Sequence, residues 1–326
     1  MKQTASGDIT CVVCGGRSVH PLFDGKDRLH HLAGNFRLHR CGDCGLAFVH
    51  PFLDQETLGR YYPEHYYSYS DSDQLEKEEF TNGNKLAFYL RHPLKAANCV
   101  LYSKILGQNR DLPAASGMNV LDVGCGDGKY LLEKRKSGAD CFGVDISPKA
   151  LARLRQKDPS IVTHCGHLWD AAFPADHFDV INFSHVLEHV TDIRRLLGEA
   201  KRVLKKDGRL RVQVPNMASL TRVLFGPCWM GLDVPRHVYV FSGHNLKALF
   251  RKTGFTIEKS RTLENSYSVL GSSVYVWNEL SGKKHELEDL AHFWDSEWAK
   301  LALFPYAFIV NALGVGDVVE FIVRKN

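Results

Sequence analysis

The sequence lacks a long uninterrupted apolar run, and its first residues carry no apolar segment of the kind found in secretory leaders. The longest apolar stretch, residues 301–315, is interrupted by Pro305 and Asn311 and is shorter than the roughly 20 residues that span a bilayer. We therefore predict a cytoplasmic protein. Two interpretations of this stretch stay open: a buried core helix, and a peripheral contact with a lipid carrier or the inner face of a membrane.

A strong excess of one charge is also missing. The chain has 41 lysines and arginines against 37 acidic residues, a formal net charge of +4, and its basic residues are spread out. Nucleic-acid-binding surfaces concentrate basic residues on one face, so this composition disfavours nucleic acid as a partner. With 326 residues, the chain can bury one large core, or one core and a small satellite domain.

Nine cysteines are present in a chain for which we expect a reducing compartment, where cysteines serve metals or cores instead of disulfides. Cys11 and Cys14 form one C-x-x-C-G knuckle, and Cys41 and Cys44 form a second. Four thiolates in two knuckles are typical of a closed tetrahedral zinc site, which is structural because no coordination position stays open. The alternative is four unrelated free thiols.

Composition divides the chain into three regions. We predict a zinc-binding knuckle domain over 1–50, an aromatic helical linker or lid over 51–115, and a larger domain over 116–326. In the larger domain, segments at about 215–242 and 264–316 are predicted insertions on the substrate side.

Strands and helices alternate from residue 118 onward, which predicts a parallel sheet with helices on both faces. The expected strands cover 118–123, 141–145, 161–163, 178–183, 209–214, 255–261 and 318–324. The expected helices cover 84–106 in the linker, and 129–137, 148–157, 192–204 and 243–253 in the larger domain.

Glycine occupies every second position of residues 124–128, between the first expected strand and helix of this domain. In such a turn a ligand lies directly on the backbone, although a tight turn without a ligand is the alternative. Asp145 ends the next strand, where its carboxylate can accept both hydroxyl groups of a ribose, so the pair predicts an adenosine-type cofactor. The spacing differs from the G-x-G-x-x-G dinucleotide pattern. Asp122 would repel a pyrophosphate and suits a cationic group such as the amine of methionine.

Five motifs carry a resemblance to a known family: D-x-G-x-G-x-G at 122–128, VDIS at 144–147, FDVI at 178–181, LEHV at 187–190 and RVLKKDGRL at 202–210. Together they resemble the class I S-adenosylmethionine-dependent methyltransferases over about residues 118–260. The resemblance implies an α/β, Rossmann-like fold whose seven-stranded sheet has an antiparallel last strand. With the cysteine knuckles and D-x-P-R-H at 233–237, the chain is similar to a bacterial subgroup associated with surface glycan or specialised sugar pathways.

The resemblance also implies S-adenosylmethionine as the cofactor and assigns its contacts. Gly124, Cys125 and Gly126 would approach the methionine moiety, Asp145 would hold the ribose, and Ile146 would pack on the adenine. His167 and Leu168 stand where many relatives place an aspartate for the adenine amine, and Leu168 can still make a backbone contact. The other residues of the predicted cofactor site are Asp122, Gly128 and Ser184.

Methyl transfer to a hydroxyl needs a group that accepts its proton, and histidine has the side chain whose ordinary pKa is nearest neutrality. We rank His185 first because it follows the fourth strand at the edge where open α/β sheets bind ligands, ahead of His237 and the tyrosines of 61–69. His185, Glu188 and His189 also match the H-x-x-E-H metallopeptidase pattern. Zinc hydrolysis would need this motif on a helix with a third ligand and another scaffold, so the expected role of Glu188 and His189 is to cap and brace a helix.

Arg236 lies in the insertion that we expect to cover the acceptor. It either binds a substrate phosphate or carboxylate or forms a structural ion pair with Asp233. We expect a methyltransferase acting on a small-molecule or sugar/glycan-type acceptor, with oxygen as the methylated atom. The alternatives are an rRNA or tRNA methyltransferase that reads RNA through its zinc module, and a non-catalytic zinc-bearing interaction protein with a degenerate fold.

Overall fold

A computed structural model of the protein describes residues 9–62, 92–106, 112–264, 266–285 and 296–326. The tyrosines after Tyr62 in the predicted lid, and the predicted helix before residue 92, lie outside these residues. From Pro93 the chain is helical, first as α4 (Pro93–Asn98) and then as a π-helical segment (Cys99–Ile105).

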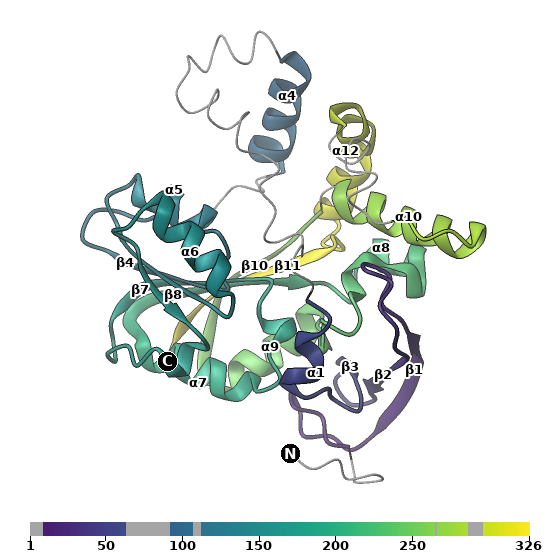
Figure 1. Ribbon diagram of the computed structural model, residues 1–326, viewed down its shortest axis with the longest axis horizontal. Helices are drawn as coiled ribbons and strands as arrows, with labels where there is room; N and C mark the ends of the chain where they lie inside the picture. The colour runs from purple at the N-terminus through teal and green to yellow at the C-terminus, as the bar shows by residue number, and fades with distance from the viewer. Residues whose placement is uncertain (1–8, 63–91, 107–111, 265, 286–295) are drawn as a thin grey trace.

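A seven-stranded mixed sheet forms the centre of the molecule (Figure 1), with the order β10-β11-β8-β7-β4-β5-β6. Strands β8, β7, β4, β5 and β6 run parallel, and β11 runs antiparallel to both β8 and β10. This arrangement confirms the predicted Rossmann-like sheet with an antiparallel last strand. The strands are β4 (Asn119–Val123), β5 (Asp140–Asp145), β6 (Val162–Cys165), β7 (Phe178–Ser184), β8 (Leu204–Pro215), β10 (Phe255–Leu263) and β11 (Val318–Lys325).

Helices cover both faces of this sheet. Their apolar sides form two separate clusters, one with α5 (Lys129–Arg135) and α6 (Pro148–Lys157), the other with α7 (Ile193–Val203) and α9 (Gly243–Lys252). Ser147 begins α6 by accepting a hydrogen bond from the Ala150 amide at 3.2 Å. The predicted bounds differ from these by at most two residues at each end, except that β8 begins at Leu204 because the chain pairs with Phe178 directly after α7.

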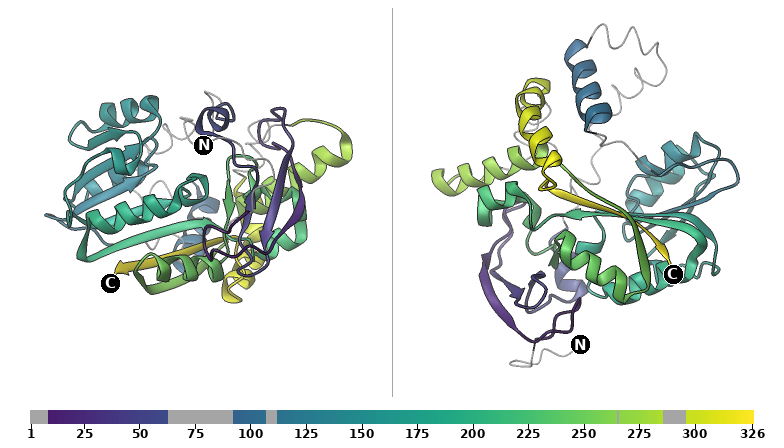
Figure 2. Two further views of the ribbon diagram at one scale, coloured as in Figure 1. Left: turned by 90° about the horizontal axis from the view of Figure 1, so that it is seen from below. Right: turned by 180° about the vertical axis from the view of Figure 1, so that it is seen from behind.

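The N-terminal region forms its own four-stranded sheet, which the sequence did not predict. Its strands are β1 (Val19–Gly25), β2 (Phe36–Cys41), β3 (Ala47–Val49) and β9 (Tyr239–Val240). Strand β9 comes from the predicted insertion, and pairs with β3 through Ala47 opposite Val240 and Phe48 opposite Tyr239. The N-terminal module, defined here as residues 9–49, lies on the side of the main sheet that carries α7 and α9 (Figures 1 and 2). Backbone pairing therefore ties this module to the insertion.

Arg236 is fully buried and joins three segments of the chain. Its Nη2 lies 2.6 Å from Asp27 Oδ1 in the N-terminal module and 2.6 Å from Asp233 Oδ1 in its own loop. Its Nη1 donates to the backbone oxygen of Tyr61 at 2.9 Å, after α1 (Gln55–Gly59). Of the two interpretations, the structural ion pair is therefore the one observed, and Arg236 is not exposed to a substrate.

Three helices extend the molecule beyond the sheet: α8 (Leu220–Phe225), α10 (Ser266–Ser281) and α12 (Glu297–Ala312). Helix α12 contains most of the apolar stretch 301–315. Ala307 and Val310 are buried, but about half of Phe308 and Ile309 is exposed, so this stretch is only partly core. In the part of the chain that the structure describes, no helix has both the length and the apolar character needed to cross a membrane.

Replacing Arg236 with methionine is expected to lower the free energy of unfolding by about 3–5 kcal/mol, because it leaves the Asp27 and Asp233 carboxylates buried without their cation. Urea unfolding measures this loss. The control is Arg37→Met, which breaks the exposed pair with Asp24 and should leave the unfolding midpoint unchanged. Equal midpoints for the two variants would contradict the structural role of Arg236.

Candidate functional site

A cavity of about 290 Å³ lies at the carboxyl ends of β4, β5 and β7. It brings together eight of the residues that the sequence predicted for the cofactor and for catalysis: Gly124, Gly126, Asp145, Ile146, His167, Leu168, Ser184 and His185. Tyr62, one of the tyrosines of the predicted lid, also lines it, as do Leu58 and Trp169, which were not predicted as contacts. The cavity therefore sits where the resemblance places a nucleoside.

The glycines of the predicted turn have two different roles. Gly124 has a φ of 70°, and a Cβ added there would lie 2.7 Å from Val186 Cγ2, so the turn can pack against this wall only as glycine. Gly128 has a φ of 84° and lies outside the cavity lining, and a Cβ there would collide with Leu154 of α6. Cys125 is buried in the cluster beneath α5 and α6. Only Gly124 and Gly126 of this turn thus face the cavity.

Asp145 is held in place by backbone amides. Its Oδ2 accepts a hydrogen bond from the Gly126 amide, and its Oδ1 accepts one from the Ser147 amide, each at 2.8 Å. Burial raises the pKa of Asp145, and these amides oppose that shift. Each oxygen keeps a second lone pair, so the carboxylate can accept two further hydrogen bonds.

Asp122 is buried next to the cavity and does not line it. Its Oδ1 accepts a hydrogen bond from Asn182 Nδ2 of β7 at 2.8 Å. The Asn182 Oδ1 in turn lies 3.3 Å from Arg211 Nη1 of β8. Asp122 therefore belongs to a polar chain that crosses the sheet, and its predicted contact with an amine stays a prediction.

Aromatic and apolar side chains lie at one end of the cavity. The rings of His167 and Trp169 stack with centroids 4.4 Å apart, and Arg195 covers the Trp169 ring at 4.6 Å. Leu168 is buried, and about half of Ile146 is exposed toward solvent. Trp169, whose ring stacks on His167 and lies under Arg195, was not predicted to line the cavity, because none of the sequence motifs includes it.

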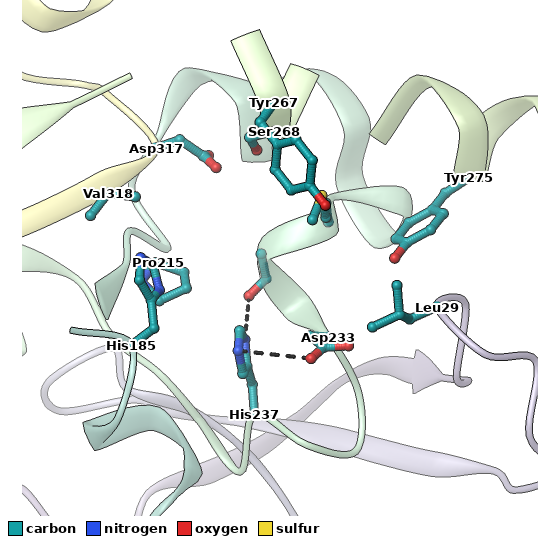
Figure 3. Close-up of a pocket in the computed structure, with 12 residues that line it drawn as sticks. Leu29, His185, Pro215, Asp233, His237, Tyr267, Ser268, Tyr275, Asp317 and Val318 are labelled. Atoms are coloured by element: carbon teal, nitrogen blue, oxygen red, sulfur yellow. Dashed lines mark hydrogen bonds and ion pairs between the residues drawn. The ribbon is translucent and has the colours of Figure 1, made fainter. Parts of the chain in front are cut away.

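Figure 3 shows the residues that line a second cavity, of about 230 Å³. His185 lines both cavities. Tyr267, Tyr275 and Asp317 lie across the second cavity from His185, and Leu29 reaches it from the N-terminal module. The two cavities thus meet at His185, whose side chain is 44% exposed.

His185 has a φ of 55°, and its Nδ1 lies 3.1 Å from Glu188 Oε1. An ionised carboxylate only accepts hydrogen bonds, so Nδ1 carries the hydrogen and Nε2 keeps its lone pair. Burial would raise the pKa of Glu188, but the hydrogen bond from His185 holds it below its ordinary value. Glu188 is therefore ionised and fixes the orientation of the His185 ring.

The H-x-x-E-H motif does not lie on an α-helix. Residues Leu187–His189 form a single 3-10 turn, and Asp192 is the N-cap of α7. The prediction that Glu188 and His189 cap a helix is therefore wrong. The peptidase geometry is absent for the same reason.

His237 and His189 lie against each other, with ring centroids 4.6 Å apart. His237 lines the second cavity but is only 6% exposed, and its Nδ1 donates to the Gly231 carbonyl oxygen at 2.9 Å. Burial and the neighbouring His237 lower the pKa of His189 to about 4. Of the two predicted catalytic histidines, His185 is thus the more accessible.

The four predicted cysteine ligands come together in the N-terminal module. Cys11 Sγ lies 3.5 Å from Cys44 Sγ, and Cys14 Sγ lies 3.5 Å from Cys41 Sγ. All four sulfurs lie within 4.8 Å of one another. Tetrahedral zinc with bonds of about 2.3 Å places its sulfur ligands at comparable separations. The donor set therefore fits zinc.

Known proteins resemble this chain in sequence. A family model described as a methyltransferase domain matches residues 91–260. An uncharacterized methyltransferase of Synechocystis sp. is 29% identical over 152 residues, which cover 45% of this chain and 71% of that protein. A demethylmenaquinone methyltransferase of Tropheryma whipplei is 40% identical over 103 residues, 31% of this chain and 43% of that protein.

A ubiquinone biosynthesis O-methyltransferase of Rhodopseudomonas palustris is 27% identical over 33% of this chain and 44% of that protein. The chain thus spans less than half the length of either quinone-biosynthesis relative. A crystal structure of an S-adenosylmethionine-dependent methyltransferase from Archaeoglobus fulgidus is 20% identical, with a TM-score of 0.45 over 76% of this chain and 97% of that one.

The matched residues 91–260 make up more than half of the 326-residue chain. They include the glycine turn, Asp145 and His185. The protein therefore belongs to this methyltransferase-domain family and is an S-adenosylmethionine-dependent methyltransferase.

Proposed function

We propose that this enzyme methylates a hydroxyl oxygen of a small-molecule or sugar-containing acceptor bound in the 230 Å³ cavity. The observation that carries the proposal is that His185 lines both this cavity and the 290 Å³ cavity. A donor in one cavity and an acceptor in the other would meet at this residue. The names of two relatives refer to menaquinone and ubiquinone, which supports a small acceptor, and the second name specifies an O-methyltransferase.

The 290 Å³ cavity is the proposed site of S-adenosylmethionine, which supplies an electrophilic methyl group on a sulfonium. Asp145 would accept the two ribose hydroxyls, since its backbone contacts leave lone pairs on both oxygens. Gly124 and Gly126 would contact the methionine moiety, with Asp122, Cys125, Gly128 and Ser184 supporting that end. Ile146, His167 and Leu168 would surround the adenine, next to Trp169.

His185 is the proposed general base. Glu188 orients its ring through Nδ1, and Nε2 is left to accept the proton of the acceptor hydroxyl. The rest of the catalytic effect is positioning, because methyl transfer is an in-line displacement that needs little more than correct alignment. His237 is too deeply buried for this role.

A structural zinc ion on Cys11, Cys14, Cys41 and Cys44 is part of the same proposal. The four sulfurs form a closed set with no position for a substrate. A reducing compartment such as the cytoplasm keeps these cysteines available as thiolate ligands.

Replacing Asp145 with asparagine is expected to weaken S-adenosylmethionine binding about 10- to 100-fold. Hydrogen bonds to a charged group are worth about 1.5–3 kcal/mol, and the new amide group would face backbone donors. Isothermal titration calorimetry measures the affinity. Asp140→Asn, an exposed position at the start of the same strand, is the control and should bind as the wild type does. Undiminished binding to Asp145→Asn would refute the ribose assignment.

Replacing His185 with glutamine is expected to lower kcat by about 10²- to 10⁴-fold, the usual contribution of a general base. Binding of S-adenosylmethionine should stay unchanged, since Asp145 and the glycine turn are intact. His177→Gln, next to the opposite end of β7, is the matched control. A kcat within a factor of two of the wild type would exclude His185 as the base.

The acceptor class is tested by methyl transfer from tritiated S-adenosylmethionine into extract, followed by separation of small-molecule, lipid, glycan and RNA pools. Label is expected in the small-molecule or glycan pool, and Asp145→Asn should strongly reduce it. Label confined to RNA would overturn the proposal in favour of an RNA methyltransferase. Absence of label from every pool, with S-adenosylmethionine binding retained, would favour the non-catalytic alternative.

A further inference from the structure

Glu188, His189 and His237 form a compact cluster outside the four-cysteine site. Each offers one potential metal-ligand atom, and the three atoms lie within 4.8 Å of one another. The first two residues come from the turn after β7, and His237 comes from the loop before β9. A backbone hydrogen bond of 2.9 Å from the Val238 amide to the Glu188 carbonyl oxygen joins these segments.

Glu188 carries one oxygen that is buried without a partner. Its side chain is 1% exposed, and Oε1 receives the hydrogen bond from His185. The other oxygen, Oε2, has no hydrogen-bond partner among the residues that the structure describes. Burying a carboxylate oxygen without a hydrogen-bond donor costs free energy. A cation or a donor within the cluster would remove this cost.

Both histidines are oriented as metal-bound histidines usually are. His189 Nδ1 lies 3.0 Å from the Arg236 carbonyl oxygen, and His237 Nδ1 lies 2.9 Å from the Gly231 carbonyl oxygen. A carbonyl oxygen can only accept, so each Nδ1 carries the hydrogen. In His189 this hydrogen is shared between the Arg236 carbonyl oxygen and the Tyr62 hydroxyl oxygen, which lies 2.9 Å from Nδ1. The nitrogen left for a ligand bond is Nε2 in each ring. A backbone carbonyl behind each ligand is the common support of metal-bound histidine.

We propose that Glu188, His189 and His237 bind a divalent transition metal, with Zn²⁺ as the reference ion. Two imidazoles and one carboxylate suit zinc and its neighbours, whereas Mg²⁺ and Ca²⁺ prefer oxygen ligands. Asp233, which is paired with Arg236, has its Oδ2 4.0 Å from His237 Nε2.

The position of this site suggests its use. His237 lines the 230 Å³ cavity and His189 lines the 290 Å³ cavity, so the metal would lie in the wall between them. Three protein ligands leave a coordination position open, as in catalytic zinc sites. An acceptor oxygen at that position would lose its proton more readily. This use rests on the proposed function, but binding of the metal does not.

The first test counts zinc in the full-length protein. Metal-depleted protein is dialysed against zinc and its content is measured by mass spectrometry, without S-adenosylmethionine or acceptor. Glu188→Gln and His237→Gln are each expected to bind one zinc ion fewer per chain than the wild type. His20→Gln, at an exposed position of β1, should match the wild type. Cys14→Ser should lose a different zinc ion, so that its loss adds to that of Glu188→Gln.

Wild-type zinc content in both Glu188→Gln and His237→Gln would overturn the proposal and leave a water or a proton between these side chains. Binding of S-adenosylmethionine by each variant checks that it is folded.

A second test needs no variant. X-ray absorption of the zinc-saturated wild type should contain zinc–nitrogen or zinc–oxygen distances of about 2.0–2.1 Å beside zinc–sulfur distances of about 2.3 Å. A spectrum with sulfur ligands alone would also overturn the site. Because both tests are read without methyl transfer, a failure of the proposed function leaves their outcome unaffected.

Discussion

The ion pairs of Arg236 hold together the parts of the protein that surround its two cavities. Asp27 belongs to the N-terminal module, Tyr61 follows α1, and Asp233 lies in the loop before β9. Charged groups are buried only when paired, since removal from water costs several kcal/mol for each ion. A guanidinium with five donors can satisfy all three partners at once. The loop that carries His237 is therefore fixed by the same residue that fixes the module.

The sequence could predict the features that depend on neighbouring residues. Apolar runs bounded by turns gave every strand of the main sheet, and the glycine turn with Asp145 located the larger cavity. Paired C-x-x-C knuckles located the cysteine cluster, because a metal-ligand spacing is local. These features share one property: each is marked by residues that are close together in the sequence, even though distant contacts assemble them.

Other features depend on contacts that no local pattern reveals. Strand β9 has two residues, and its pairing with β3 joins positions almost 200 residues apart. Arg236 and Asp27 are 209 residues apart, and His237 and Glu188, although nearer in sequence, also lie on separate segments of the chain. The motif at 185–189 indicated which side chains could bind a metal or a proton. It did not indicate their backbone conformation, because the same residues occur in a 3-10 turn and in an α-helix. The role of each of these residues depends on contacts with residues from other segments of the chain.

Leu29 gives the N-terminal module a place inside the methyltransferase. It lines the smaller cavity and packs against Leu270, Val274 and Tyr275 of α10. The module thus forms part of the chamber that the methyltransferase domain leaves open. Changes at Leu29 and its neighbours can alter the shape of that chamber while the sheet, the glycine turn and Asp145 stay as they are. In the proposed function, the outer module therefore takes part in selecting the acceptor, while the proposed cofactor contacts of the glycine turn and Asp145 belong to the main sheet.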